Sequence, residues 1–248
     1  MADLAKDGFV VFDTDPRVTR WATRAHVAAC DVASDPVQRA KWLRHGETWF
    51  VGVDALSNGA DGSIGDVGLS GPWKDIITAP KAWHRAQVSV VYDGYPKKDP
   101  QESEAAHKFR VNRCAAHVDG LHLEAGRRIV REPHAFILGL PLNNSDACSL
   151  VVWRGSHLVM RVALAEAVGS CDPCGVDVTE AYIAARRAVF DTCEAVEVPL
   201  RVGQAVLVDR FALHGVAPWR SGDTAPPEGR MIAYFRPEFE DPADWFLG

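Results

Sequence analysis

The stretch Val202–Gly215, with the sequence VGQAVLVDRFALHG, carries the pattern that decides the fold. A Val-Gly turn comes first, followed by the apolar run 205–208 and then by a polar rim that ends in His214-Gly215. Apolar runs of this length between turn residues are typical of short buried strands. The stretch therefore predicts a strand followed closely by a histidine.

Similar short runs recur through the second part of the chain. Further strand candidates are residues 86–92, 110–117, 135–142, 150–153, 195–199 and 231–236, whereas residues 162–168 and 178–190 have helical spacing. Many short strands with turns between them predict an antiparallel sandwich or barrel rather than a parallel α/β sheet.

The first part of the chain has a different pattern of apolar and polar residues. A short strand candidate at 7–13 is followed by apolar residues at helical spacing over 17–45, and then by a stretch rich in glycine and aspartate up to residue 71. The sequence contains no clear linker and no repeat. The simplest architecture is one domain over 1–248, in which a mostly helical N-terminal layer at 1–85 backs a β core at 86–240.

The overall composition limits the classes of function. The chain has 248 residues, 47% of them hydrophobic, and a net charge of −6 without a long basic run, which argues against nucleic-acid binding. It begins without a signal-peptide pattern and has no apolar stretch of about 20 residues, so we expect a soluble, cytoplasmic protein with no membrane partner. Cys171 and Cys174 have CxxC spacing, but no further pair of zinc ligands accompanies them.

The strongest local signal for chemistry is His117-Val118-Asp119. Residues two apart in an extended segment project to the same side, so the imidazole and the carboxylate can meet one metal ion. His214, at the end of the stretch quoted above, offers a second imidazole. Two histidines and one carboxylate on one face of an octahedron leave three positions open, which is the arrangement of non-haem Fe(II) oxygenases.

An arginine follows at the start of the last strand candidate. Arg230, Ile232 and Tyr234 would share one face of that strand, so Arg230 can point into a barrel. The planar guanidinium of arginine suits a carboxylate because the two groups pair through two parallel hydrogen bonds.

The order of HxD, a distant histidine and then an arginine resembles the phytanoyl-CoA dioxygenase-like branch of the Fe(II)/2-oxoglutarate-dependent oxygenases. Three other stretches resemble that family as well. Asp7–Val11 is similar to its early strand, the segment 140–157 is similar to its stretch ending in Gly-Ser-His, and Gly203–His214 is similar to its strand before the distal histidine. The resemblance covers roughly residues 86–236, and it is weaker at Asp7–Val11 near the start of the chain.

The resemblance implies a double-stranded β-helix (a jelly-roll, cupin-like barrel) with the metal at its open mouth. It further implies that His117, Asp119 and His214 are the catalytic iron ligands and that Arg230 binds the far carboxylate of 2-oxoglutarate. Dioxygen and a small organic substrate complete the reaction, which releases succinate and carbon dioxide. Halogenating relatives lack the carboxylate ligand, so Asp119 favours hydroxylation.

The sequence departs from the family pattern in several places. Trp153-Arg154 stands where a proline is more common before Gly-Ser-His, and Gln204 replaces a common aspartate. The gap between His214 and the arginine is longer than usual, through the insertion 224–229. Arg220 is therefore a rival to Arg230 for the role of binding 2-oxoglutarate.

Two other classes of function stay open. Another cupin-type metalloenzyme that does not use 2-oxoglutarate would keep the three ligands but would not need Arg230. The other alternative is a non-catalytic metal-binding barrel whose metal site is vestigial. The remaining histidines have structural interpretations: we expect His122 to lie in a turn, His134 to be exposed, and His157 to order the backbone.

Overall fold

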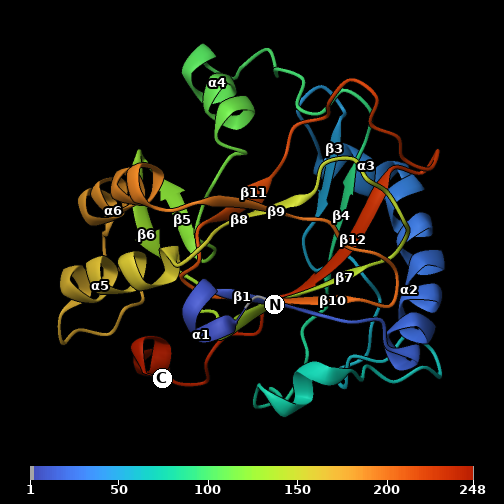
Figure 1. Ribbon diagram of the computed structural model, residues 1–248, viewed down its shortest axis with the longest axis horizontal. Coiled ribbons are helices and arrows are strands. Elements are labelled where there is room, and N and C mark those ends of the chain that lie inside the picture. The colour runs from blue at the N-terminus through green and yellow to red at the C-terminus, as the bar shows by residue number, and fades with distance from the viewer. Residues whose placement is uncertain (1–2, 248) are drawn as a thin grey trace.

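A computed structural model describes residues 3–247, which form a large and a small antiparallel sheet with helices outside both, together with a separate two-stranded hairpin (Figure 1). The large sheet has the strand order β1-β10-β7-β12-β4-β3-β2. Its strands are β1 (Phe9–Phe12), β10 (Ala205–Asp209), β7 (Phe136–Pro141), β12 (Arg230–Phe235), β4 (Gln87–Val91), β3 (Trp49–Gly52) and β2 (Leu43–Arg44).

The small sheet has the order β11-β8-β9, with β11 (His214–Val216), β8 (Leu150–Trp153) and β9 (Ala195–Val198). A bridge between His117 and His214 extends it by one more segment. From β4 onward the chain alternates between the two sheets. It leaves β4 in the large sheet for the His117 bridge at the small sheet, returns to β7 in the large sheet, and crosses to β8 and β9 in the small sheet. It then passes to β10 in the large sheet, to β11 in the small sheet and finally to β12 in the large sheet. Two antiparallel sheets connected in this way form a jelly roll, which confirms the predicted double-stranded β-helix.

Side chains alternate across the large sheet, because successive residues of a strand point to opposite faces. Ile137, Val206 and Ile232 point between the two sheets and form the inner core. Their neighbours Leu138 and Leu207 point the other way and belong to the core under the helices. The central strands are therefore apolar on both faces, which explains their continuous hydrophobic runs.

Helix α2 (Pro16–Ser34) covers the outer face of the large sheet (Figure 1). Asp15 caps it by accepting a hydrogen bond from the Arg17 amide, and Pro16 occupies the first turn, where no amide donor is needed. Its buried residues recur every three or four positions, which creates one apolar stripe. They are Val18, Trp21, Ala22, Ala25, Ala29 and Ala33.

Other helices complete the layers. Helices α5 (Ser156–Val168) and α6 (Thr179–Thr192) pack against the outer side of the small sheet. The remaining helical segments are α1 (Leu4–Asp7), α3 (Pro36–Trp42), α4 (Glu104–Asn112), η1 (Pro72–Asp75) and η2 (Pro242–Phe246). None of the helices described is both long and apolar enough to cross a membrane.

The structure differs from the sequence-based expectations in detail. The N-terminal part contributes strands as well as helices, because β1, at the candidate 7–13, and β2 and β3 extend the large sheet at its two edges. Residues 110–117, predicted as a strand, contain the end of α4 followed by a turn. The hairpin of β5 (Leu121–Glu124) and β6 (Arg127–Val130) was not predicted from the sequence.

Candidate metal centre

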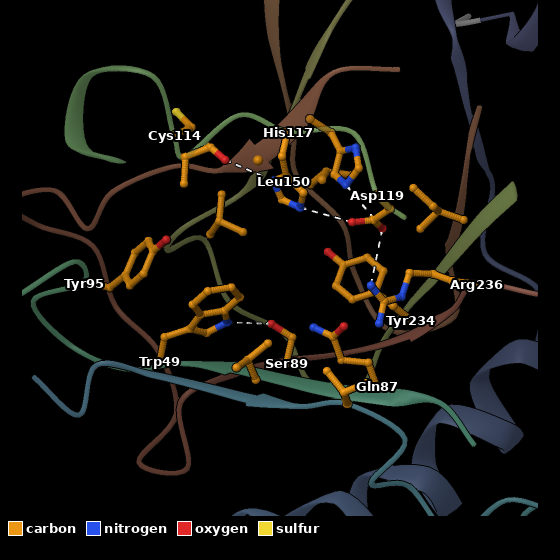
Figure 2. Close-up of a pocket in the computed structure, with 17 residues that line it drawn as sticks. Trp49, Gln87, Ser89, Tyr95, Cys114, His117, Asp119, Leu150, Tyr234 and Arg236 are labelled. Atoms are coloured by element: carbon orange, nitrogen blue, oxygen red, sulfur yellow. Dashed lines mark hydrogen bonds and ion pairs between the residues drawn. The ribbon is translucent and has the colours of Figure 1, made fainter. Parts of the chain in front are cut away.

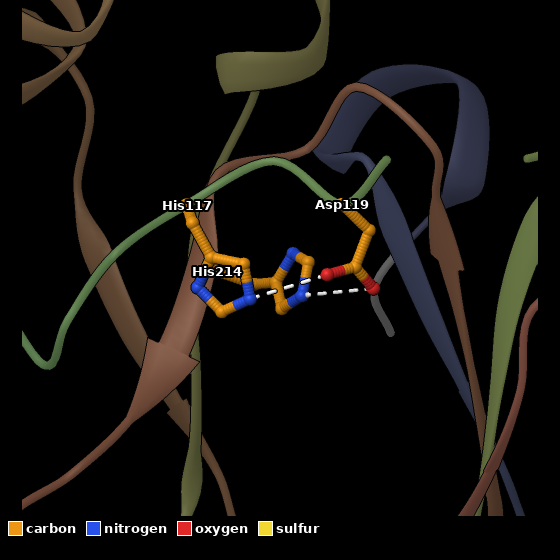
Figure 3. Close-up of side chains that lie close together, drawn as sticks. All are labelled: His117, Asp119 and His214. Carbon is orange, nitrogen blue, oxygen red and sulfur yellow. Dashed lines mark ion pairs between the residues drawn. The ribbon is translucent and has the colours of Figure 1, made fainter. Parts of the chain in front are cut away.

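His117 and His214 are paired residues on neighbouring backbone segments (Figure 3). The amide of His117 donates to the carbonyl of His214 at 2.9 Å, and the amide of His214 donates back at 3.0 Å. The next residue, Gly215, makes this approach possible, since a Cβ there would lie 2.1 Å from the Cys114 carbonyl oxygen. The His-Gly pair is therefore a steric requirement of the site.

The turn that leads into His117 is strained. Cys114 and Ala115 both have φ of 51°, a left-handed conformation that costs a residue with a Cβ on the order of 1 kcal/mol. The amide of Val216 donates to the Cys114 carbonyl at 3.0 Å and holds the turn against β11. Strain of this kind persists where the surrounding structure fixes it, and it is concentrated at functional sites.

Three ligand atoms converge beside this pair. His117 Nε2 lies 3.2 Å from Asp119 Oδ1, and His214 Nε2 lies 3.8 Å from Oδ2. Each Nδ1 lies close to a backbone carbonyl, that of Ala115 at 3.0 Å and that of Ala212 at 2.9 Å. Because a carbonyl only accepts, each Nδ1 carries a proton, which leaves each Nε2 as the ring nitrogen that a metal ion in the shared space would meet.

The electrostatic setting favours the charge states that a cation needs. Burial lowers the pKa of His214 to about 4, so its imidazole is neutral at pH 7. Burial alone would raise the pKa of Asp119, but the Arg236 guanidinium beside it holds the pKa well below its ordinary value. A neutral imidazole and an ionised carboxylate are the states in which these groups bind metal ions.

The donor set fits a divalent first-row metal. Its three ligand atoms all lie within 4.8 Å of one another, and adjacent ligands of an octahedral ion at about 2.1 Å lie roughly 3 Å apart. Two imidazoles and one carboxylate suit ferrous iron and leave three coordination positions free. Across residues 3–247, no other group of three such side chains converges, and Cys171 and Cys174 are exposed.

A cavity of about 170 Å³ opens from the three ligands into the space between the sheets (Figure 2). Its walls are mostly apolar, with Val51, Ile137 and Leu150 among them. Gln87 and Ser89 of β4 and Tyr234 and Arg236 on and just after β12 add polar groups. In Figure 2 the Gln87 amide and the Tyr234 hydroxyl point into the cavity.

The sequence analysis placed Tyr234 on the inward face of Arg230 but missed Gln87, Ser89 and Arg236, although a signal for two of them existed. Gln87 and Ser89 stand two apart in an otherwise apolar strand, so they share one face. Ser89 accepts a hydrogen bond from Trp49 Nε1 at 3.0 Å. Arg236 gave no such signal. Its Nη1 lies 3.6 Å from Oδ2 of Asp119, but the two residues are far apart in the sequence, so local spacing does not predict their contact.

The two arginines predicted to compete for one role lie in different surroundings. Arg230, the first residue of β12, is 7% exposed, and its Nη1 is buried without a hydrogen-bond partner. No carboxylate within the described residues pairs with it. Arg220 is more than half exposed and forms a two-pronged ion pair with Glu197. Arg230 does not line the cavity itself, but Tyr234 on the same strand does.

The other histidines occupy structural positions. His157 Nε2 lies 3.1 Å from the Ala5 carbonyl oxygen and its ring packs against Gly8, so two of the stretches that carry the family resemblance meet here. His122 lies on β5, half exposed, rather than in a turn. His134 is 5% exposed, so the expectation that it lies at the surface is wrong.

Neither a protein-family model nor a curated protein matches the sequence. Several solved structures are similar in fold. EctD from S. alaskensis, solved with 2-oxoglutarate and 5-hydroxyectoine, is 16% identical over 94% of this chain and 72% of its own, with a TM-score of 0.43. SnoK, a non-heme alpha ketoglutarate dependent carbocyclase from nogalamycin biosynthesis, is 12% identical over 94% and 80%, with a TM-score of 0.48. AviO1 from Streptomyces viridochromogenes Tue57 is 16% identical over 96% and 93%, with a TM-score of 0.38.

Proposed function

We propose that the chain is an Fe(II)- and 2-oxoglutarate-dependent dioxygenase that hydroxylates a small organic substrate. The observation that carries this proposal is a convergent pair of imidazoles and a carboxylate, His117, His214 and Asp119, at the mouth of a jelly roll. These three residues would hold the iron, each through the ring nitrogen or carboxylate oxygen that already faces the shared space. Three open positions remain for a chelating co-substrate and dioxygen.

The unpaired guanidinium of Arg230 supports 2-oxoglutarate as the co-substrate. A buried guanidinium without a counter-ion is unfavourable, because its desolvation is not offset by a partner charge. A dicarboxylate that chelates the metal with one end would offer the other carboxylate to this side chain as a charge-assisted pair. Arg220 is a weaker candidate, since its guanidinium already forms an ion pair with Glu197.

Bound ferrous iron, with 2-oxoglutarate and dioxygen, supplies the oxidising power to replace a substrate C–H by C–OH, with release of succinate and carbon dioxide. The chain's own residues supply position and exclude water. The apolar walls around Val51 and Leu150 limit access of water to the cavity. Gln87 and Tyr234 offer hydrogen bonds that fix the orientation of the co-substrate.

Anaerobic titration tests this proposal directly. Addition of 2-oxoglutarate to the protein loaded with Fe(II) should produce a visible charge-transfer band that saturates at one equivalent, and Asp119→Ala should abolish it. Oxygen should then give succinate in an iron-dependent manner. Iron binding without the band would instead favour a cupin-type metalloenzyme that does not use 2-oxoglutarate. No iron binding at all would favour a non-catalytic barrel.

A further inference from the structure

A second pocket, of about 160 Å³, adjoins the cavity at the metal centre, because Val53 and Arg236 line both. Unlike the first cavity, it is surrounded mainly by charged and polar side chains. These are Asp54, His84, Glu132, His134, Arg236 and Glu238. None of the functions argued above uses this pocket.

The charges around the pocket do not balance. Three carboxylates line it, whereas its one permanent cation, Arg236, already lies against Asp119 at 3.6 Å. Two of the acids have imidazole neighbours. His84 Nδ1 lies 3.2 Å from Asp54 Oδ1, and the Nε2 atoms of His134 and His122 lie 3.3 and 3.4 Å from the Glu132 carboxylate. Within the described part of the chain, Glu238 has no ion-pair partner. The permanent charges of the pocket, three carboxylates and one guanidinium that also lies beside Asp119, are therefore net negative.

A buried histidine is available to a ligand in the same pocket. His134 is 5% exposed, and neither of its ring nitrogens has a hydrogen-bond partner. Its Nε2 lies 3.3 Å from Glu132 Oε2 without the alignment of a hydrogen bond, and its Nδ1 has no hydrogen-bond partner among the described residues. An unsatisfied buried polar group costs about 1–3 kcal/mol, so a ligand that satisfies it gains affinity.

We propose that this pocket binds the ammonium group of the substrate, so that the substrate is a small amine with a C–H bond that reaches the metal centre. An ammonium group has three N–H donors, which match carboxylates and a neutral imidazole nitrogen. A metal ion fits less well, because among the residues described only His117, Asp119 and His214 converge as a group that could hold one. This inference rests on the proposed function.

Binding of simple amines to the metal-free protein tests the pocket without relying on turnover. The probes are 1,4-diaminobutane, L-ornithine and L-lysine, each compared with its N-acetylated form by isothermal titration calorimetry. At least one free amine should bind, and acetylation should weaken it about ten-fold or more, because a charged hydrogen bond is lost. Glu238→Gln and Asp54→Asn should each weaken the amine by a similar factor. Glu240→Gln, which removes an exposed acid paired with Lys81, is the matched control and should leave binding unchanged.

The outcomes separate this inference from the proposed function. If the protein forms the Fe(II)–2-oxoglutarate band but no free amine binds better than its acetylated form, the amine assignment is overturned and the proposed function stands. If the amine binds as expected and also accelerates iron-dependent succinate formation, both are supported. If the amine binds but the band never forms, the amine is not the substrate of an oxygenase, and the inference falls together with the proposed function.

Discussion

Arg236 Nη1 lies 3.6 Å from Asp119 Oδ2, and both side chains are largely buried. This ion pair joins the end of β12, in the large sheet, to the carboxylate beside the small sheet. It keeps Asp119 ionised in a setting where burial would otherwise favour the protonated acid. Arg236 is therefore a positioning residue for the carboxylate, and it acts across the gap between the two sheets.

Replacing this arginine should weaken metal binding without removing a ligand. We expect Arg236→Met to lower Fe(II) affinity about 10- to 100-fold, the usual effect of losing a group that orients a metal ligand. Arg236→Lys retains the charge and should recover part of the affinity. Anaerobic calorimetric titration measures both. Equal iron affinity in Arg236→Met and wild type would show that the ion pair does not act on the site.

The three ligands themselves should be individually essential. His117→Ala, Asp119→Ala and His214→Ala should each abolish tight Fe(II) binding, while circular dichroism shows a folded protein. His122→Ala is a matched control, because this half-exposed histidine lies three residues beyond Asp119 and contacts Glu132 instead. Wild-type iron affinity in two of the three ligand variants would refute the assigned site.

Binding of 2-oxoglutarate should distinguish the two arginines named from the sequence. Arg230→Met should raise the dissociation constant roughly 30-fold or more, because losing a buried charge pair costs on the order of 2–5 kcal/mol. Arg220→Met removes an exposed ion pair with Glu197 and should change it little. Intensity of the charge-transfer band against 2-oxoglutarate concentration measures both variants. The opposite ranking would transfer the role to Arg220.

Gly215 should be intolerant of any side chain. In Gly215→Ala the new Cβ would lie 2.1 Å from the Cys114 carbonyl oxygen, so the two segments must separate. We expect a loss of about 1–3 kcal/mol in the free energy of unfolding and weaker iron binding, because His117 and His214 lose their pairing. Gly68→Ala is the control, since nothing lies within 4 Å of a Cβ at that position. Urea denaturation of both variants gives the comparison.

Strands with β-branched or apolar runs could be predicted because burial on both faces leaves a continuous signal. The run at 205–208 is one example, and β10 (Ala205–Asp209) lies there between β1 and β7 of the large sheet. The prediction failed at 110–117, where α4 ends and a strained turn follows. A local signal for the helix existed in Ser103, whose hydroxyl accepts a hydrogen bond from the Ala106 amide at the helix start.

The metal site was readable from the sequence only in part. His117 and Asp119 are two residues apart, so local geometry links them, and His214 follows a recognisable strand. Arg236 could not be assigned in this way, because its place at the cavity depends on how the two sheets face each other. The burial of His134 likewise depends on a bridge to Glu238, far along the chain.

The pairing of His117 with His214 also sets an order of events during synthesis. One partner lies near the middle of the chain and the other beyond β10, while Arg236, which positions Asp119, comes later still. A ribosome must therefore extend the chain at least to Arg236, and release that segment from its exit tunnel, before the site exists. Metal loading is thus a late step in biogenesis, and a nascent chain stalled before β11 should carry no specific iron.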